Sequence, residues 1–115
     1  MKPVRVVLSH DAREVYNYLN KNSISKNERM ILKSVHQKVE LIKMNPHYGD
    51  PIAKNLILKE YLIKFGITNL FRVELPNFWR MLYSLTGNGD IEIVAFVLDI
   101  IDHKVYNKKF GYSSR

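Results

Sequence analysis

The chain contains no cysteine among its 115 residues. This absence excludes disulfide scaffolds, thiol nucleophiles and cysteine-based metal sites, and it fits a reducing compartment, so we expect a cytoplasmic location. A long hydrophobic run is missing as well. The most apolar stretch, residues 91–101, contains Glu92 and Asp99 and falls far short of the ~20 residues of a membrane span. The N-terminal residues also lack the apolar stretch of a signal peptide, so we expect no membrane association.

Glycine and proline are scarce, with five and four residues, and they do not cluster into a linker. The sequence shows no internal repeat and no low-complexity tract. Hydrophobic residues make up 46% and charged residues 25% of the chain, which is typical of a folded globular protein. The length leaves room for one hydrophobic core, so we predict a single domain over residues 1–115.

The charge is strongly positive, with a formal net charge of +7 and a pI near 9.7. A positive field of this size on a small domain attracts polyanions and favours salt-dependent binding to phosphates. Charge alone leaves two other interpretations open, namely solubility and an acidic protein partner.

The first half of the chain predicts a strand followed by two helices. A β-branched run over Val4–Leu8 predicts the strand, and Ser9 can cap the helix after it. The segment Ser25–Glu28 is a capping box for a second helix, which Asn45–Pro46 ends. Because apolar residues recur at helical spacing, we expect a helical hairpin packed on a sheet. These residues are Ala12, Val15, Tyr16 and Leu19, then Leu32, Val35, Val39 and Ile42.

The second half changes to a period of two. Residues 47–55 are expected to form a loop, and residues 58–65, closed by Gly66, either a short helix or two strand-like turns. Apolar residues then alternate along 71–75 and 79–85, which predicts two strands joined at Pro76–Asn77, with a second turn at 87–90. Residues 91–100 are apolar on both faces and predict a central strand.

Asp102 and Gly111 bound a short last helix. The expected architecture is α+β: a helical hairpin packed on a twisted, mainly antiparallel four-stranded sheet, with a short C-terminal helix.

The strand pattern assigns three charged residues to one face. If the apolar residues of the hairpin face the core, Arg72, Glu74 and Arg80 lie on the opposite face, with Arg72 roughly opposite Arg80. Adjacent guanidiniums repel each other. Either they clamp an anion such as phosphate, whose oxygens match guanidinium donors, or Glu74 bridges them in a surface ion pair worth ~0–1 kcal/mol. The spacing leaves both interpretations open.

The last helix carries two further candidates. His103 and Tyr106 are three residues apart and share a helical face. A histidine can move protons and a tyrosine can stack on a base, although Tyr106 could equally be a core residue. The remaining histidines are scattered, so we expect no metal and no cofactor. They are His10, His36 and His47.

Residues 69–75, the following turn and residues 79–83 together resemble the arginine-bearing hairpin of the RelE/ParE toxin superfamily. The helical hairpin ending in Asn-Pro, the apolar last strand and the terminal Val105–Tyr106 are similar to the same plan, over Val4 to about Tyr112. Residues 56–68 and 102–112 resemble a divergent, archaeal RelE-like branch.

The resemblance implies the toxin of a type II toxin–antitoxin pair, which enters the ribosome, cuts mRNA without metal and so inhibits translation. It matches Arg80 to the phosphate-stabilising arginine, Arg72 to a basic strand position and Tyr106 to the C-terminal tyrosine. His103 or Lys104 would handle protons. Lysines before the hairpin would add charge toward RNA: Lys54, Lys59 and Lys64. The implied partners are an acidic antitoxin, mRNA and ribosomal RNA; a homodimer stays open.

Two positions depart from the family pattern. Glu74 stands where the family usually has lysine or arginine, and Asp99 and Asp102 flank a strand end where an arginine is expected. The general acid and base are then unfilled unless His103 or Lys104 substitutes, and the loss of one costs ~10²–10⁴ in rate. The alternative function is therefore a weak or inactive superfamily member that binds RNA or a protein target, as ParE-like gyrase inhibitors do.

Overall fold

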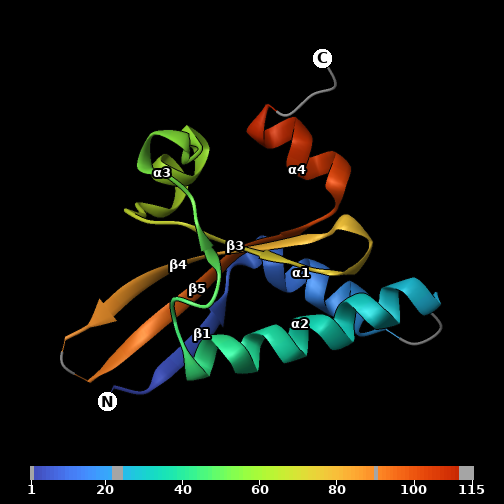
Figure 1. Ribbon diagram of the computed structural model, residues 1–115, viewed down its shortest axis with the longest axis horizontal. Helices are drawn as coiled ribbons and strands as arrows, with labels where there is room; N and C mark the ends of the chain where they lie inside the picture. The colour runs from blue at the N-terminus through green and yellow to red at the C-terminus, as the bar shows by residue number, and fades with distance from the viewer. Residues whose placement is uncertain (1, 22–24, 90, 112–115) are drawn as a thin grey trace.

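The computed structural model describes residues 2–21, 25–89 and 91–111. These residues form a five-stranded sheet in the order β1-β5-β4-β3-β2, with helices on both faces (Figure 1). The strands are β1 (Val4–Leu8), β2 (Asp50–Pro51), β3 (Phe71–Glu74), β4 (Arg80–Asn88) and β5 (Glu92–Ile101). The helices are α1 (His10–Leu19), α2 (Lys26–Met44), α3 (Lys59–Phe65) and α4 (His103–Phe110), with short 3-10 turns η1 (Lys54–Leu56) and η2 (Pro76–Phe78).

The predicted helical hairpin is confirmed. The Ser9 side chain accepts a hydrogen bond from the backbone of Ala12, and Ser25 and Glu28 form both bonds of the capping box. In Figure 1, α1 and α2 lie together on one side of the sheet. Their apolar faces and that side of the sheet share one core, which includes Ala12, Leu19, Ile31, Val35, Ile42, Val73, Met81, Tyr83, Val97 and Ile100.

The short elements are also confirmed. Residues 59–65 form a helix and not strands, and Gly66 ends it in the left-handed conformation at φ 62°. The Asp102 side chain caps α4 by accepting from the backbone of Val105. β4 runs on to Asn88, so residues 87 and 88, which were predicted to lie in the second turn, belong to the strand. Asp90 of that turn and Tyr112 lie outside the described residues.

The α+β class is confirmed, but the prediction of a four-stranded sheet is wrong. The sheet has a fifth strand, β2, inside the segment expected to be a loop, and it pairs Asp50 with Arg72 and Pro51 with Phe71. A two-residue strand is too short to show an alternating pattern, so its sequence carries no strand signal. The sheet is mixed, because β1 is parallel to β5 while the other neighbours are antiparallel.

The expected pairing of Arg72 with Arg80 is also wrong. Arg72 lies opposite Leu82, and Arg80 lies opposite Glu74. The observed register differs from the expected one by two residues, which keeps the same side chains on each face but moves Arg80 from Arg72 to Glu74. The backbone N–H of Leu75 instead donates to the carbonyl of Trp79 at 2.8 Å, leaving the three-residue turn η2.

The second face of the sheet is not an open basic surface. α3 and α4 lie over it (Figure 1), and a second core fills the space beneath them. The central position of β5, between β1 and β4, is thereby covered on both faces, as predicted. Residues of this second core are Ile57, Tyr61, Leu70, Leu82, Leu98, Ile101 and Tyr106. Arg72 and Arg80 are confined to the edge of this face, beside α4.

None of the described helices is long and apolar enough to cross a membrane.

Gly49, the residue before β2, allows the chain to pass close to β3 and β4. A Cβ at this position would lie 2.9 Å from Tyr83 Cε1 and 3.1 Å from the carbonyl oxygen of Arg72. We predict that Gly49→Ala lowers the free energy of unfolding by about 1–3 kcal/mol through overpacking, measured by urea denaturation. Gly87→Ala is the matched control, because its Cβ would meet nothing within 4 Å. Equal effects of the two substitutions would contradict the close approach.

Candidate functional site

Arg72, Arg80 and Tyr106 converge at the end of the β3–β4 hairpin, although they lie on three different elements. The Arg72 guanidinium donates from Nη1 to the Tyr106 hydroxyl at 3.3 Å. The Arg80 guanidinium carbon lies 4.7 Å from the centre of the Tyr106 ring, a cation–π contact. The alternation along β3 and β4 points both arginines to the face that α4 covers, and α4 brings Tyr106 between them.

Glu74 bridges the two arginines. Its Oε1 lies 3.5 Å from Nε of Arg72 and 3.5 Å from Nε of Arg80. Both Nε atoms are buried, and neither forms a hydrogen bond to any described residue. The Glu74 side chain is 53% exposed, so it can move into water without disturbing the sheet. Of the two interpretations left open above, the structure contains the carboxylate bridge.

Arg72 makes more polar contacts than Arg80. The hydrogen bond to Tyr106, followed by the charges of Glu74 and Asp50, raises the pKa of its guanidinium against the opposing effect of burial. Asp50 Oδ2 lies 3.9 Å from Nη2 of Arg72. β2 therefore adds a second carboxylate to the site. The sequence analysis did not find it, because residues 47–55 were expected to form a loop.

Two hollows flank Arg72. One, of about 240 Å³, is lined by Arg72 and Glu74 together with Lys38 of α2. The other, of about 290 Å³, lies between β2, η1 and α4, where Tyr106 and Phe110 line it with Arg72. Lys38 is a further cation beside the site. Its Nζ reaches the Tyr48 hydroxyl at 3.1 Å across the loop after α2, and the helical pattern could not indicate this contact.

Tyr106 is not a platform for a base. Its side chain is 2% exposed, the Phe110 ring stacks on it at 4.5 Å, and Arg80 lies over the ring. The role left for Tyr106 is to position Arg72 and Arg80, through its hydroxyl and its ring respectively.

His103 and Lys104 are exposed on the first turn of α4. The His103 ring lies 5.6 Å from the ring of Phe78, which sits at the hairpin tip. The Phe78 carbonyl in turn accepts a hydrogen bond from Arg80 Nη1. Phe78 therefore contacts both His103 and Arg80, while Nε2 of the His103 ring lies 3.2 Å from Nδ2 of Asn107 on the next turn of α4. The sequence analysis missed Phe78 because it lies inside the turn.

The three lysines before the hairpin differ in their surroundings: one forms an ion pair and two are exposed. Lys64 forms an ion pair with Asp11 at 2.8 Å, so it ties α3 to α1 instead of extending the site. Lys54 and Lys59 are exposed on η1 and α3. Lys54 belongs to the turn that borders the 290 Å³ hollow, through its neighbours Ala53 and Leu56.

Asp99 occupies the strand end where the resemblance places an arginine. A bulge in the β4–β5 pairing, between Leu82 and Tyr83 of β4, shifts the register. Asp99 is buried and accepts a hydrogen bond from the Tyr61 hydroxyl of α3. Burial raises the pKa of Asp99 despite that hydrogen bond, and burial also raises the pKa of Tyr61. Asp99 therefore fastens α3 to the sheet and does not reach the arginine pair.

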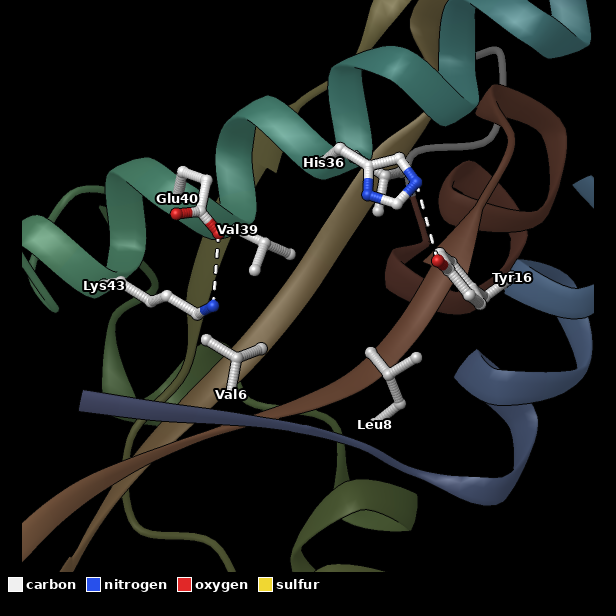
Figure 2. A pocket seen from close by; sticks show the side chains of 8 residues that line it. Val6, Leu8, Tyr16, His36, Val39, Glu40 and Lys43 are labelled. Carbon is white, nitrogen blue, oxygen red and sulfur yellow. Dashed lines mark hydrogen bonds and ion pairs between the residues drawn. The ribbon is translucent and has the colours of Figure 1, made fainter. Parts of the chain in front are cut away.

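A further hollow of about 340 Å³ lies between β1, α1 and α2 (Figure 2). Val6, Leu8 and Val39 form its apolar wall. Its polar groups contact one another: Lys43 pairs with Glu40 at 3.1 Å, and the Tyr16 hydroxyl lies 3.5 Å from Nε2 of the exposed His36. Because it contains no guanidinium and lies on the other side of the sheet, it is separate from the arginine site.

Within the described ranges, no group of three or more His, Asp or Glu side chains is placed to hold a metal ion. No family model, curated protein or solved structure matches the chain. The geometry of the arginine site is therefore the basis for assigning a function.

We predict that Asp99→Asn raises the free energy of unfolding at pH 7, because a neutral amide still accepts from Tyr61 without burying a charge. With its pKa raised in the native state, Asp99 favours folding below the unfolded value of about 3.9, and this contribution is lost as pH rises through the native pKa. The advantage of the variant should therefore shrink as pH falls toward about 4 in urea titrations.

Asp11→Asn is the control for this prediction. The hydrogen bond from Lys64 lowers the pKa of Asp11, so this substitution should lower stability at pH 7 by a small amount. A less stable Asp99→Asn variant at pH 7 would show that the carboxylate charge is needed in the fold.

Proposed function

We propose that this chain is the toxin of a type II toxin–antitoxin pair, with a RelE-like fold, and that it cuts ribosome-bound message without a metal. The observation that carries the proposal is that Tyr106 contacts both Arg72 and Arg80, and that the same two arginines share one exposed carboxylate, Glu74. Two guanidiniums held side by side offer several donors to the oxygens of one phosphate. The helical hairpin on a largely antiparallel sheet is consistent with a RelE-like plan.

In this mechanism the scissile phosphate replaces Glu74 between the two guanidiniums. The buried Nε atoms, which lack a hydrogen-bond acceptor among the described residues, then donate to phosphate oxygens. Positive groups that are fixed before the reaction stabilise the negative charge that develops on the non-bridging oxygens of the phosphate. Tyr106 keeps Arg72 and Arg80 in place during the exchange.

The proton transfers fall to Glu74 and His103. Displaced Glu74 stays beside the phosphate and accepts the proton of the ribose 2′-hydroxyl, as the 2′-oxygen bonds to phosphorus. Protonated His103 gives its proton to the 5′-oxygen as the bond from phosphorus to that oxygen breaks. The products are a 2′,3′-cyclic phosphate and a 5′-hydroxyl end, so each proton removed is matched by one supplied.

The proposal includes the partners and place of action. An acidic antitoxin would cover the arginine site, since a net charge of +7 favours association with an acidic segment. Ribosomal RNA and mRNA would be the nucleic acid partners, in the cytoplasm. The alternative is a member that binds RNA or a protein target without cutting, and the ion pairs of Glu74 with both arginines favour it.

We predict that Arg80→Ala reduces cleavage of ribosome-bound message at least tenfold, measured by primer extension. Arg80→Lys should also lose activity, because lysine keeps the charge but not the planar fork of donors. Arg5→Ala is the matched control: Arg5 pairs with Glu92 at 2.9 Å on β1, away from the site. Unchanged cutting by both Arg80 variants would eliminate the proposed site, while intact message with wild-type protein would favour the binding-only alternative.

Glu74→Gln separates the two functions of the carboxylate. Removing the competing charge should tighten RNA binding, by up to about fivefold for an exposed ion pair worth ~1 kcal/mol. Removing the base should slow cleavage by ~10²–10⁴. Binding is measured by fluorescence anisotropy and cleavage by primer extension. Faster cleavage by this variant would show that Glu74 only blocks the site.

A further inference from the structure

Phe78 is held in solvent by an unusual backbone. Its side chain is 69% exposed, and its φ of 63° follows one of 58° at Asn77. Bulky residues rarely adopt positive φ, because Cβ then crowds the neighbouring carbonyl group. Glycine at this position would relieve the strain and remove an exposed apolar ring. Folding stability alone therefore gives no reason for a phenylalanine here, and such outliers cluster at ligand sites.

The surroundings of Phe78 are cationic. Its carbonyl accepts from Arg80 Nη1, and its ring lies 5.6 Å from the His103 ring with the planes tilted by 52°. Lys104, the next residue of α4, is exposed. An exposed aromatic residue whose backbone contacts an arginine can offer its ring to a base while the arginine holds the neighbouring phosphate, as in proteins that bind single-stranded nucleic acids.

Other aromatic residues fit this role less well. Of the Phe, Tyr and Trp side chains that the structure describes, those exposed by more than a third are Tyr18, Tyr48 and Phe78. Tyr18 belongs to α1, on the other side of the sheet, and Tyr48 already carries Lys38 over its ring at 5.5 Å. Phe78 alone of the three contacts Arg80, through its carbonyl group.

We infer that Phe78 and His103 form a stacking site for an unpaired base of single-stranded RNA, adjoining the phosphate on Arg80. This inference rests on the proposed function and specifies its substrate as unpaired RNA. Because every base has a flat face, the site accepts all four bases, and it excludes a duplex, whose bases are stacked on one another.

The test compares a ligand with bases to one without. The probes are a 2′-O-methylated oligoadenylate, which cannot be cleaved through its 2′-oxygen, and inorganic polyphosphate. Phe78→Gly should bind the oligoadenylate about fivefold or more weakly and polyphosphate as the wild type does. Phe78→Trp should restore oligoadenylate binding, and Phe78→Leu, with no aromatic face, should not. Arg80→Ala should weaken binding of both probes.

The controls separate failure of this inference from failure of the proposed function. Phe78→Gly should melt at the wild-type temperature or above, because glycine tolerates φ 63°. Ile91→Gly removes an apolar side chain that is 73% exposed in the β4–β5 turn and should leave binding unchanged. Wild-type oligoadenylate binding by Phe78→Gly, or equal loss of both probes, would overturn the stacking site. Oligoadenylate binding that does not depend on Arg80 would overturn the proposed function instead.

Discussion

The ion pairs between Glu74 and the two arginines depend on the register of the β3–β4 hairpin. The three-residue turn sets Glu74 opposite Arg80, and the strand period returns Arg72 to the same face two residues earlier. A shift of β4 by one residue against β3 would turn Arg80 toward the first core, away from Arg72 and Glu74. The hydrophobic alternation that buries one face of each strand therefore also places the three charged side chains together on the other face.

The second core explains why the arginines lie at an edge. Leu82, opposite Arg72, is fully buried beneath α3 and α4, so most of this sheet face is closed to solvent. Tyr106 belongs both to that core and to the site, since its ring packs among apolar residues while its hydroxyl accepts from Arg72. The packing of α4 consequently determines the spacing of the two guanidiniums. A substitution in the core beneath α4 would therefore change the geometry of the site, although the substituted residue does not contact the arginines.

The elements could be predicted from sequence where their signals are local. The capping box at Ser25 and the stop at Pro46 predicted α2 closely, and the alternation predicted that Arg72 and Arg80 share a face. The strand β2 and the burial of Tyr106 depend on contacts between distant segments, which leave no local pattern. The register depends on the turn η2, because registers two residues apart have the same alternation. Phe78 was missed for a related reason: its importance lies in its backbone conformation and its neighbours, and neither can be read from residue order.

In the proposed mechanism, the end of β5 supplies neither the acid nor the base. Asp99 is buried under α3 and hydrogen-bonded to Tyr61, and its raised pKa reflects that burial. A group enclosed in this way cannot reach the phosphate that the proposed mechanism places at Arg80. The exposed titratable groups at the hairpin end, Glu74 and His103, are contributed by β3 and by the start of α4. In the proposed mechanism, the proton transfers therefore take place at β3 and at the start of α4, and not at the end of the last strand. Glu74, which departs from the pattern of the superfamily that the chain resembles, is then the base.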